Sequence, residues 1–318
     1  MAVPQLPTAS SHLPIFLAGP TAVGKSEIAL RLAEKIGGEI ITVDSMQVYR
    51  GLDIGTAKPL PAERARVPHH LLDVCDLSAA FDAAQFVQLA QKAVAEIQMR
   101  GRTPIFCGGT GLYFKAFLEG IGAAPPGDAA LRAELEAAPL ENLLSELREH
   151  DPATFEKIDR QNPRRVVRAV EVIRLTGKKF SEQQADWQAA SATGTAETFF
   201  CLTRSAEDLH RRINLRVDEM FARGLVNETR ALLPHGLAEN KFALQAIGYR
   251  QVVEHLRGER DLPATIELVK IKTRQFAKRQ LTWFRRHGNC EWLDLKPDET
   301  AAETLTRLTL RLVVPATP

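Results

Sequence analysis

The segment Gly19-Pro20-Thr21-Ala22-Val23-Gly24-Lys25-Ser26 has the spacing of a complete phosphate-binding loop, GxxxxGK followed by a serine. Apolar residues at 15–18 predict a buried strand before it, and residues 26–36 repeat apolar positions at helical spacing after it. A loop between a strand and a helix suits phosphate, because its backbone amides and the helix N-terminus both attract an anion. We therefore expect a diphosphate or triphosphate here, with the Lys25 ammonium beside it and the Ser26 hydroxyl as a ligand of Mg²⁺.

Outward from this loop, further apolar runs predict strands at 40–43, 70–74, 104–107, 198–203 and 290–295. A helical pattern at 83–99 lies between two of them. Strands that alternate with helices are typical of a parallel sheet. The predicted fold class is therefore α/β, a P-loop core with a parallel sheet and helices on both of its faces.

Residues 123–196 predict a separate helical insertion domain. A turn rich in Pro and Gly at 123–127 precedes helical patterns at 131–137, 140–149 and 163–176, and no strand pattern interrupts them. The core domain would then consist of 1–122 and 197–318. In its second part we expect long helices at 205–223, 242–257 and 264–287, while the short tail from residue 296 on is uninformative.

Composition excludes several classes of protein. The chain has 318 residues and a net charge of +2, so total charge does not point to any partner. No run reaches the roughly 18 apolar residues of a membrane helix, and the first residues lack a secretory signal pattern. We expect a cytoplasmic protein with no membrane contact. The four cysteines are far apart, without metal or redox spacing, and are interpreted as buried thiols.

Asp44 ends the strand expected at 40–43. Ligands of doubly wound sheets bind at this edge, where a carboxylate can act as a general base or hold a water on Mg²⁺. Its position alone fits equally well an aspartate that caps the next turn. The strand at 104–107 runs into Gly108-Gly109-Thr110, where ATP-hydrolysing P-loop enzymes usually carry a second Mg²⁺-binding acid. The absence of that acid weighs against ordinary ATP hydrolysis.

Six segments together resemble the bacterial tRNA dimethylallyltransferases, also called tRNA isopentenyltransferases. They occur in the order of that family and span nearly the whole chain. The segments are GPTAVGKS at 19–26, DSMQVY at 44–49, GLDIGTAKP at 51–59, GGTGLY at 108–113, AIGYR at 246–250 and TRQFAKRQLTWFR at 273–285.

The resemblance implies transfer of a dimethylallyl group from dimethylallyl diphosphate to N6 of adenine 37 in tRNA, with release of diphosphate. Asp44 would be the base that takes the N6 proton, and Thr110 would hydrogen-bond the substrate unless it only closes a turn. Of two arginines one helical turn apart, Arg216 is preferred to Arg212 as a diphosphate contact. The predicted diphosphate contacts are Gly19, Thr21, Ala22, Val23, Gly24, Lys25, Ser26, Arg212 and Arg216. A solvated helix face is the alternative for the two arginines. Mg²⁺ on Ser26 is the only expected cofactor, and no zinc site is expected.

The RNA partner implied by the resemblance is the anticodon stem-loop, whose adenine must be flipped out of its stack. The segment 270–286 has seven basic residues and no acid, and its positions 274, 278, 281 and 285 share a helical face suited to a phosphate backbone. Trp283 and Phe284 would stack on bases or fill the core. The predicted tRNA contacts are Asp44, Ser45, Met46, Gln47, Thr110, Arg132, Arg164, Arg165, Arg168, Gln245, Ala246, Ile247, Gly248, Tyr249, Arg250, Arg274, Lys278, Arg279, Gln280, Leu281, Thr282, Trp283, Phe284 and Arg285.

Three other functions compete with a monomeric tRNA prenyltransferase. An adenylate isopentenyltransferase acts on free nucleotide and needs neither the insertion nor the basic helix. A P-loop small-molecule kinase would turn over ATP, against which the missing second acid argues. A non-catalytic RNA-binding module would need none of Asp44, Lys25 and Ser26.

Overall fold

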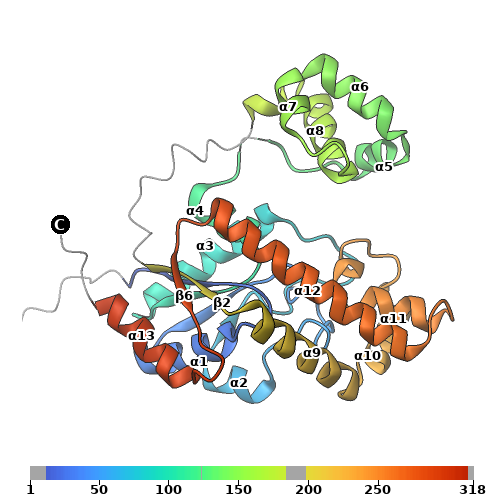
Figure 1. Cartoon of the computed structure of the whole chain (residues 1–318). Helices are drawn as coiled ribbons and strands as arrows, with labels where there is room; N and C mark the ends of the chain where they lie inside the picture. Colours follow the sequence, from blue (N-terminus) through green and yellow to red (C-terminus); the bar gives the residue numbers. More distant parts are fainter. Residues whose placement is uncertain (1–11, 123, 184–197, 314–318) are drawn as a thin grey trace, which may run out of the picture. The chain divides into compact units, whose positions relative to one another are not determined.

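The chain folds into two compact units in the computed structural model, which describes residues 12–122, 124–183 and 198–313. One unit consists of residues 1–115 with 194–318, and the other of residues 116–193 (Figure 1). The second unit overlaps the predicted insertion. The limits predicted for the insertion, at 123 and 196–197, fall on residues outside the described part of the chain.

A six-stranded sheet in the order β3-β2-β4-β1-β5-β6 forms the first unit, and every neighbouring pair is parallel. This confirms the predicted α/β fold. The strands are β1 Ile15–Ala18, β2 Glu39–Val43, β3 His69–His70, β4 Pro104–Gly108, β5 Phe199–Thr203 and β6 Glu291–Asp294. The strand predicted at 70–74 is wrong in extent, because Leu71 and Asp73 have φ angles of 62° and 55°, which no strand accommodates.

One face of the sheet packs against α1 Lys25–Ile36, α9 Ala206–Ala222 and α13 Ala301–Val313. Side chains alternate between the faces of a strand, so Ile15 and Leu17 of β1 point into this layer while Phe16 does not. The helices contribute apolar stripes at helical spacing. Buried members of the stripes are Ile28, Leu32, Ile213, Val217 and Leu308.

The other face is built on aromatic rings. Phe16 stacks on Phe106 of β4 with ring centroids 4.9 Å apart, and Phe199 of β5 lies 5.7 Å away. Phe114 of α4 Gly111–Glu119 stacks on Phe199 and also meets Phe284 of α12 Leu262–His287 edge-on. The helix α3 Ala83–Met99 contacts β2 and β4. Helices therefore cover both faces, as predicted.

One prediction for the C-terminal part of the chain is wrong. The helix expected at 242–257 is broken into a 3₁₀ turn, Ala243–Gln245, and α11 Tyr249–Leu256, because Gly248 has a φ of 106° that interrupts a right-handed helix. After residue 296, where the sequence was uninformative, α13 packs on α1 and buries Leu308 completely. The remaining helices of this unit are the short α2 Pro61–Arg66 and α10 Leu225–Leu232.

Helices are the regular elements formed by the described residues of the second unit. Its helices α5 Ala129–Ala137, α6 Leu140–His150, α7 Pro152–Lys157 and α8 Pro163–Thr176 enclose a core of their own (Figure 1). Leu135, Leu143 and Val170 are among its buried side chains. Gly177 ends α8 in the left-handed conformation that favours glycine. None of the described helices of the chain combines the length and apolarity needed to cross a membrane.

Candidate active site

The phosphate-binding loop leaves β1 and enters α1 with backbone angles that glycine permits. Gly19 has a φ of 146°, and a Cβ there would lie 2.6 Å from the carbonyl oxygen of Leu202. Gly24 has a φ of 110° and precedes the first residue of α1. Ala22, with a φ of 63°, adopts a conformation that costs an alanine free energy. The backbone of the loop is therefore held in a conformation that its glycines permit but that Ala22 does not favour.

Two arginines hold the loop from outside. Arg204 Nε donates to the carbonyl oxygen of Val23, and Arg212 Nε donates to that of Ala22, both at 2.9 Å. Arg204 is buried and also bonds Asp208 Oδ2 at 2.9 Å. The sequence predicted Arg212 as a diphosphate ligand, yet its Nε is engaged by the loop, and Arg204 was not predicted at all. The one local feature that could have pointed to Arg204 is its position, a basic residue between the end of β5 and the N-cap of α9.

Lys25 is folded back onto the loop, where its Nζ donates to the carbonyl oxygen of Pro20 at 2.7 Å. Burial, with a smaller contribution from the nearby Arg216 guanidinium, lowers the pKa of Lys25 to about 8, while Cys107 and Asp44 oppose the shift. An anion placed beside Lys25 would favour its charged form. The loop and Lys25 together form a site prepared for negative charge.

Asp44 follows β2 and lies close to both Lys25 and Arg216. Burial raises the pKa of Asp44 above its ordinary value, and two backbone amides and the two cations oppose this only in part. Those amides, of Met46 and Gln47, donate to Oδ1 at 2.8 and 3.2 Å. The aspartate thus caps its turn with one oxygen. Oδ2 accepts no hydrogen bond from any described residue and remains available to a substrate proton.

Thr110 lies on the neighbouring loop, between β4 and α4. Its Oγ1 accepts a hydrogen bond from the backbone amide of Ser45 at 3.1 Å. The amides of Gly109 and Thr110 both donate to the carbonyl oxygen of Val43 at 3.2 Å. A Cβ on Gly108 would lie 2.0 Å from that same oxygen, so only glycine fits against the end of β2. Thr110 is therefore placed beside Asp44 by backbone contacts on both sides.

The helix α12 closes this end of the sheet through side chains predicted to contact tRNA. The Gln280 amide is buried between Thr21 and Gly109, and the Trp283 ring occupies the space that a Cβ on Gly111 would need. Phe284 is fully buried against Phe114. Its predicted contact with a base is therefore wrong, and the alternative, packing in the core, is correct.

The exposed face of α12 differs slightly from the predicted one. Lys278 and Arg285 are exposed, as are Arg279 and Thr282. Leu281 is partly buried against the core, and Arg274 Nη1 donates to Asn214 Oδ1 of α9 at 2.6 Å. The exposed basic face is therefore rotated away from the stripe expected at 274, 278, 281 and 285. Arg274 therefore serves as a contact between α12 and α9, while Leu281 belongs to the core packing.

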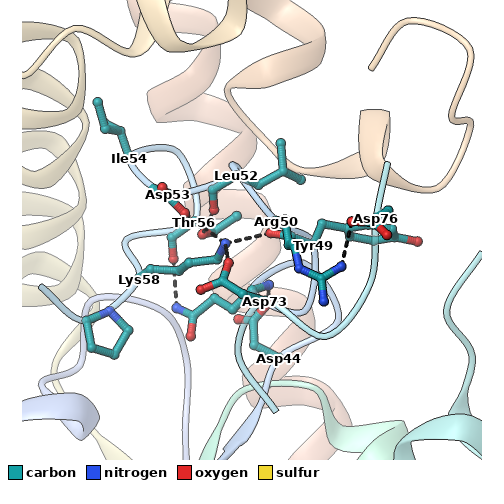
Figure 2. Close-up of polar contacts among 12 residues, drawn as sticks. Asp44, Tyr49, Arg50, Leu52, Asp53, Ile54, Thr56, Lys58, Asp73 and Asp76 are labelled. Carbon is teal, nitrogen blue, oxygen red and sulfur yellow. Dashed lines mark hydrogen bonds and ion pairs between the residues drawn. The ribbon is translucent and has the colours of Figure 1, made fainter. Parts of the chain in front are cut away.

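The segment 44–58 is bound by a buried lysine that the sequence did not single out (Figure 2). Lys58 Nζ donates to the carbonyl oxygen of Tyr49 at 2.5 Å, to Asp53 Oδ1 at 2.8 Å and to Asp73 Oδ1 at 2.5 Å. Gln47 joins the same segment, since its Nε2 donates to the carbonyl oxygen of Thr56 at 2.9 Å. The predicted tRNA contact Gln47 thus has its amide engaged within the protein.

The predicted tRNA contacts at 245–250 support that segment. Tyr249 is fully buried, donates to Glu228 Oε1 at 2.5 Å and accepts from the Gly55 amide at 3.1 Å. Glu228 also accepts from the Ile54 amide, at 2.9 Å. Arg250 is exposed and pairs with Glu254 one turn later. The motif around Tyr249 therefore has a structural task, whatever else its exposed residues bind.

In the second unit, two of the predicted tRNA-binding arginines converge on one buried acid. Arg132 Nη2 and Arg168 Nη1 each lie 2.7 Å from Oε2 of Glu171, whose side chain is not exposed at all. Arg168 also donates to the carbonyl oxygen of Pro125 at 2.6 Å. Arg165 is exposed. The contacts predicted for Arg132, Arg164, Arg165 and Arg168 with tRNA stay predictions.

Ser26 is the oxygen donor of the loop that suits a magnesium ion. Mg²⁺ prefers oxygen ligands and keeps several of its waters, so one hydroxyl is an ordinary protein contribution when a diphosphate completes the shell. Among the described residues no group of three or more His, Cys, Asp or Glu could hold a metal ion alone. The hydroxyl of Ser26 therefore fits Mg²⁺ bound together with a phosphate group.

Known proteins resemble the chain over most of its length. Residues 47–287 match the family model described as IPP transferase. A tRNA dimethylallyltransferase of Geobacter metallireducens is 46% identical over 288 residues, covering 88% of this chain and 92% of that protein. One from Geobacillus thermodenitrificans is 44% identical over 293 residues, covering 91% and 92%.

Two solved structures show the same architecture. The full-length tRNA isopentenylpyrophosphate transferase of Bacillus halodurans matches with a TM-score of 0.67 and 37% identity, covering 94% of this chain and 96% of that one. A eukaryotic dimethylallyltransferase described as acting on tRNA matches with a TM-score of 0.72 and 30% identity, covering 89% and 73%.

Proposed function

Because the chain belongs to the IPP transferase family, we propose from its site that it is a tRNA dimethylallyltransferase. It transfers a dimethylallyl group to N6 of an adenine in tRNA, and its acceptor is adenine 37 of the anticodon loop. The donor is dimethylallyl diphosphate. The observation that carries this proposal is the grouping of Asp44 with Lys25 and Arg216 at the phosphate-binding loop.

The loop side of the site favours departure of diphosphate. As the bond between C1 of the dimethylallyl group and the bridging oxygen breaks, its electron pair stays on that oxygen. Lys25, Arg216 and the loop amides stabilise the charge that develops there. A divalent ion bound with the diphosphate, here proposed to be Mg²⁺, neutralises further negative charge. Arg204 and Arg212 act indirectly, because they keep the loop carbonyls turned outward.

The Asp44 side of the site serves the acceptor. The N6 lone pair of adenine is delocalised into the ring, so the amine attacks well only if its proton is removed as the new bond to C1 forms. Asp44 Oδ2 receives that proton, while Oδ1 is kept in place by the Met46 and Gln47 amides. Burial raises the pKa of Asp44, which makes it a stronger base than an exposed aspartate.

Transfer of label decides between this function and its competitors. The protein is mixed with labelled dimethylallyl diphosphate, Mg²⁺ and an anticodon stem-loop carrying adenine at 36 and 37, and in parallel with AMP or ATP. We expect label on the stem-loop and none on the nucleotides. Label on AMP or ATP alone would identify an adenylate isopentenyltransferase, and ATP turnover without label transfer would identify a kinase. We further propose that the enzyme is a cytoplasmic monomer, which sedimentation of the purified protein tests for the oligomeric state.

A further inference from the structure

We propose that Gln280 is a positioning residue, which sets the distance between the diphosphate loop and the loop that places Asp44. The inference rests on the proposed function and concerns the geometry of that same site. Gln280 Oε1 accepts a hydrogen bond from the Thr21 amide at 2.8 Å, and its Nε2 donates to the carbonyl oxygen of Gly109 at 3.0 Å. One side chain thus joins the two loops across the end of the sheet.

The fit of Gln280 is specific to an amide. The residue is 7% exposed, so each of its two polar atoms needs a partner within the protein. A primary amide offers both a donor and an acceptor at this length at any pH, whereas a carboxyl group of the same length does so only when it is protonated. Gly109 shows the same fit from the other side, because a Cβ there would lie 2.1 Å from Gln280 Nε2. Gly109 does not have a positive φ angle. Glycine is therefore required at this position for space and not for its backbone conformation.

The contact continues to the proposed base through the backbone. Beside Gly109, Thr110 Oγ1 accepts from the Ser45 amide, and Ser45 directly follows Asp44. The amides of Gly109 and Thr110 also hold the carbonyl oxygen of Val43, which directly precedes Asp44. A shift of the Gly109 carbonyl relative to Thr21 would therefore move the base relative to the leaving diphosphate.

Group transfer depends steeply on such a distance. The dimethylallyl carbon must lie between the departing oxygen and the attacking N6, and a displacement of about 1 Å can cost 10²-fold in rate. Within the described part of the chain, Gln280 is the side chain whose hydrogen bonds join the two loops of this site. The diphosphate and the RNA would each still find their own contacts if Gln280 were lost. The expected consequence is a loss of rate without a matching loss of binding.

The first test is Gln280→Met, which keeps the length of the side chain and removes both hydrogen bonds. We expect kcat for label transfer to fall on the order of 10²-fold. The Kd values for inorganic diphosphate and for the stem-loop, measured by calorimetry, should each change by less than about threefold. The control is Thr265→Val. Thr265 is fully buried on the same helix, and its hydroxyl bonds only the carbonyl oxygen of Asp261, so its kcat should match the wild type.

The second test, Gln280→Glu, separates positioning from simple core packing. A carboxylate at 280 can accept from Thr21 but repels the Gly109 carbonyl, whereas the protonated acid can donate to it. Burial raises the pKa of a carboxyl group. We therefore expect the ratio of the kcat of Gln280→Glu to that of the wild type to rise severalfold as pH falls from about 8 to 5.5. The ratio removes the titration of Asp44, and circular dichroism checks that both proteins stay folded.

The outcomes distinguish this inference from the proposed function. If the wild type transfers label and the rate of Gln280→Met lies within threefold of the wild-type rate, the inference is overturned and the proposed function is not. The same holds for a fall in kcat that is accompanied by an equal loss of diphosphate or RNA affinity, or for a Gln280→Glu ratio that does not change with pH. A wild type that transfers no label to RNA overturns both.

Discussion

Thr110 Oγ1 accepts a hydrogen bond from the backbone amide of Ser45 at 3.1 Å, so the hydroxyl fixes the residue that follows the proposed base Asp44. Thr110→Val keeps the shape of the side chain and removes the acceptor. We expect kcat to fall by up to about tenfold, which corresponds to the upper end of the roughly 0.5–1.5 kcal/mol of one hydrogen bond. Thr110→Ser keeps the hydroxyl and should stay within threefold of the wild type in single-turnover assays. An equal loss in both variants would assign the effect to the methyl group instead.

Asp44→Asn tests the base directly. An amide cannot take the N6 proton, so transfer should fall roughly 10²- to 10⁴-fold, the usual range for general-base catalysis, while the stem-loop is still bound. Asp44 must be ionised to act, and its pKa is raised by burial. The wild-type rate should therefore fall as pH falls, at a midpoint above that of an ordinary aspartate, and this limb should be missing from the variant. A variant with the same acid limb would exclude Asp44 as its source.

The parts of this site that the sequence predicted are those defined by neighbours in the chain. The strand, loop and helix around Lys25 follow from local spacing, and Asp44 follows from its place at the end of an apolar run. The sequence missed Arg204 and Lys58, and it assigned Gln280 to RNA. The partners of Arg204 and Gln280 at the loop lie 181 and 259 residues away in the chain, so no local pattern reports them.

The helices show a related limit. Periodicity predicted α12 within two residues of its observed ends, but it could not say which side meets α9, and the basic face was placed too close to the buried border. The break at Gly248 was missed because glycine is also tolerated inside helices. Tyr249, which directly follows the break, packs against Gly55, where a Cβ would lie 2.4 Å from the tyrosine ring.

Lys25 should make binding of diphosphate depend on pH. Its pKa is lowered to about 8 by burial, so in the free protein the ammonium is charged below that pH and neutral above it. The Kd for inorganic diphosphate should therefore be flat at lower pH and should weaken above about 8, by at most tenfold per pH unit. Calorimetry of the wild type and of Lys25→Met checks this. The variant should bind more weakly at neutral pH and lose the limb near 8, and a limb retained in Lys25→Met would belong to another group.

Arg204 and Arg211 share the carboxylate of Asp208 but differ in burial, which makes them a matched pair. The Arg204 side chain is 5% exposed and the Arg211 side chain 61%. Arg204→Met leaves Asp208 and the Val23 carbonyl without a buried partner, so the free energy of unfolding should fall by about 3–5 kcal/mol. Arg211→Met should change it by less than about 1 kcal/mol. Urea unfolding measures both. Comparable values for the two variants would mean that Arg204 does not hold the loop as the contacts indicate.

The exposed face of α12 should carry part of the RNA affinity. Lys278 and Arg279 are both exposed there, on the helix whose Gln280 reaches the diphosphate loop. The double variant Lys278→Ala with Arg279→Ala should weaken the Kd for the anticodon stem-loop about 10- to 100-fold near 0.1 M salt. If each side chain neutralises one phosphate of a single strand, the slope of log K against log salt should decrease by about 1.4.

A charge-matched control shows whether that loss belongs to α12. Arg31 and Lys35 lie on α1, where Arg31 pairs with Glu27 and Lys35 donates to Thr309 Oγ1. Replacing both with alanine removes the same net charge from the protein at a different surface. Long-range attraction alone would weaken RNA binding similarly in both double variants, since salt screens charges without regard to the helix that carries them. We expect the α1 variant to keep the wild-type Kd and salt slope, because α12, unlike α1, is expected to place its cations against the phosphate backbone.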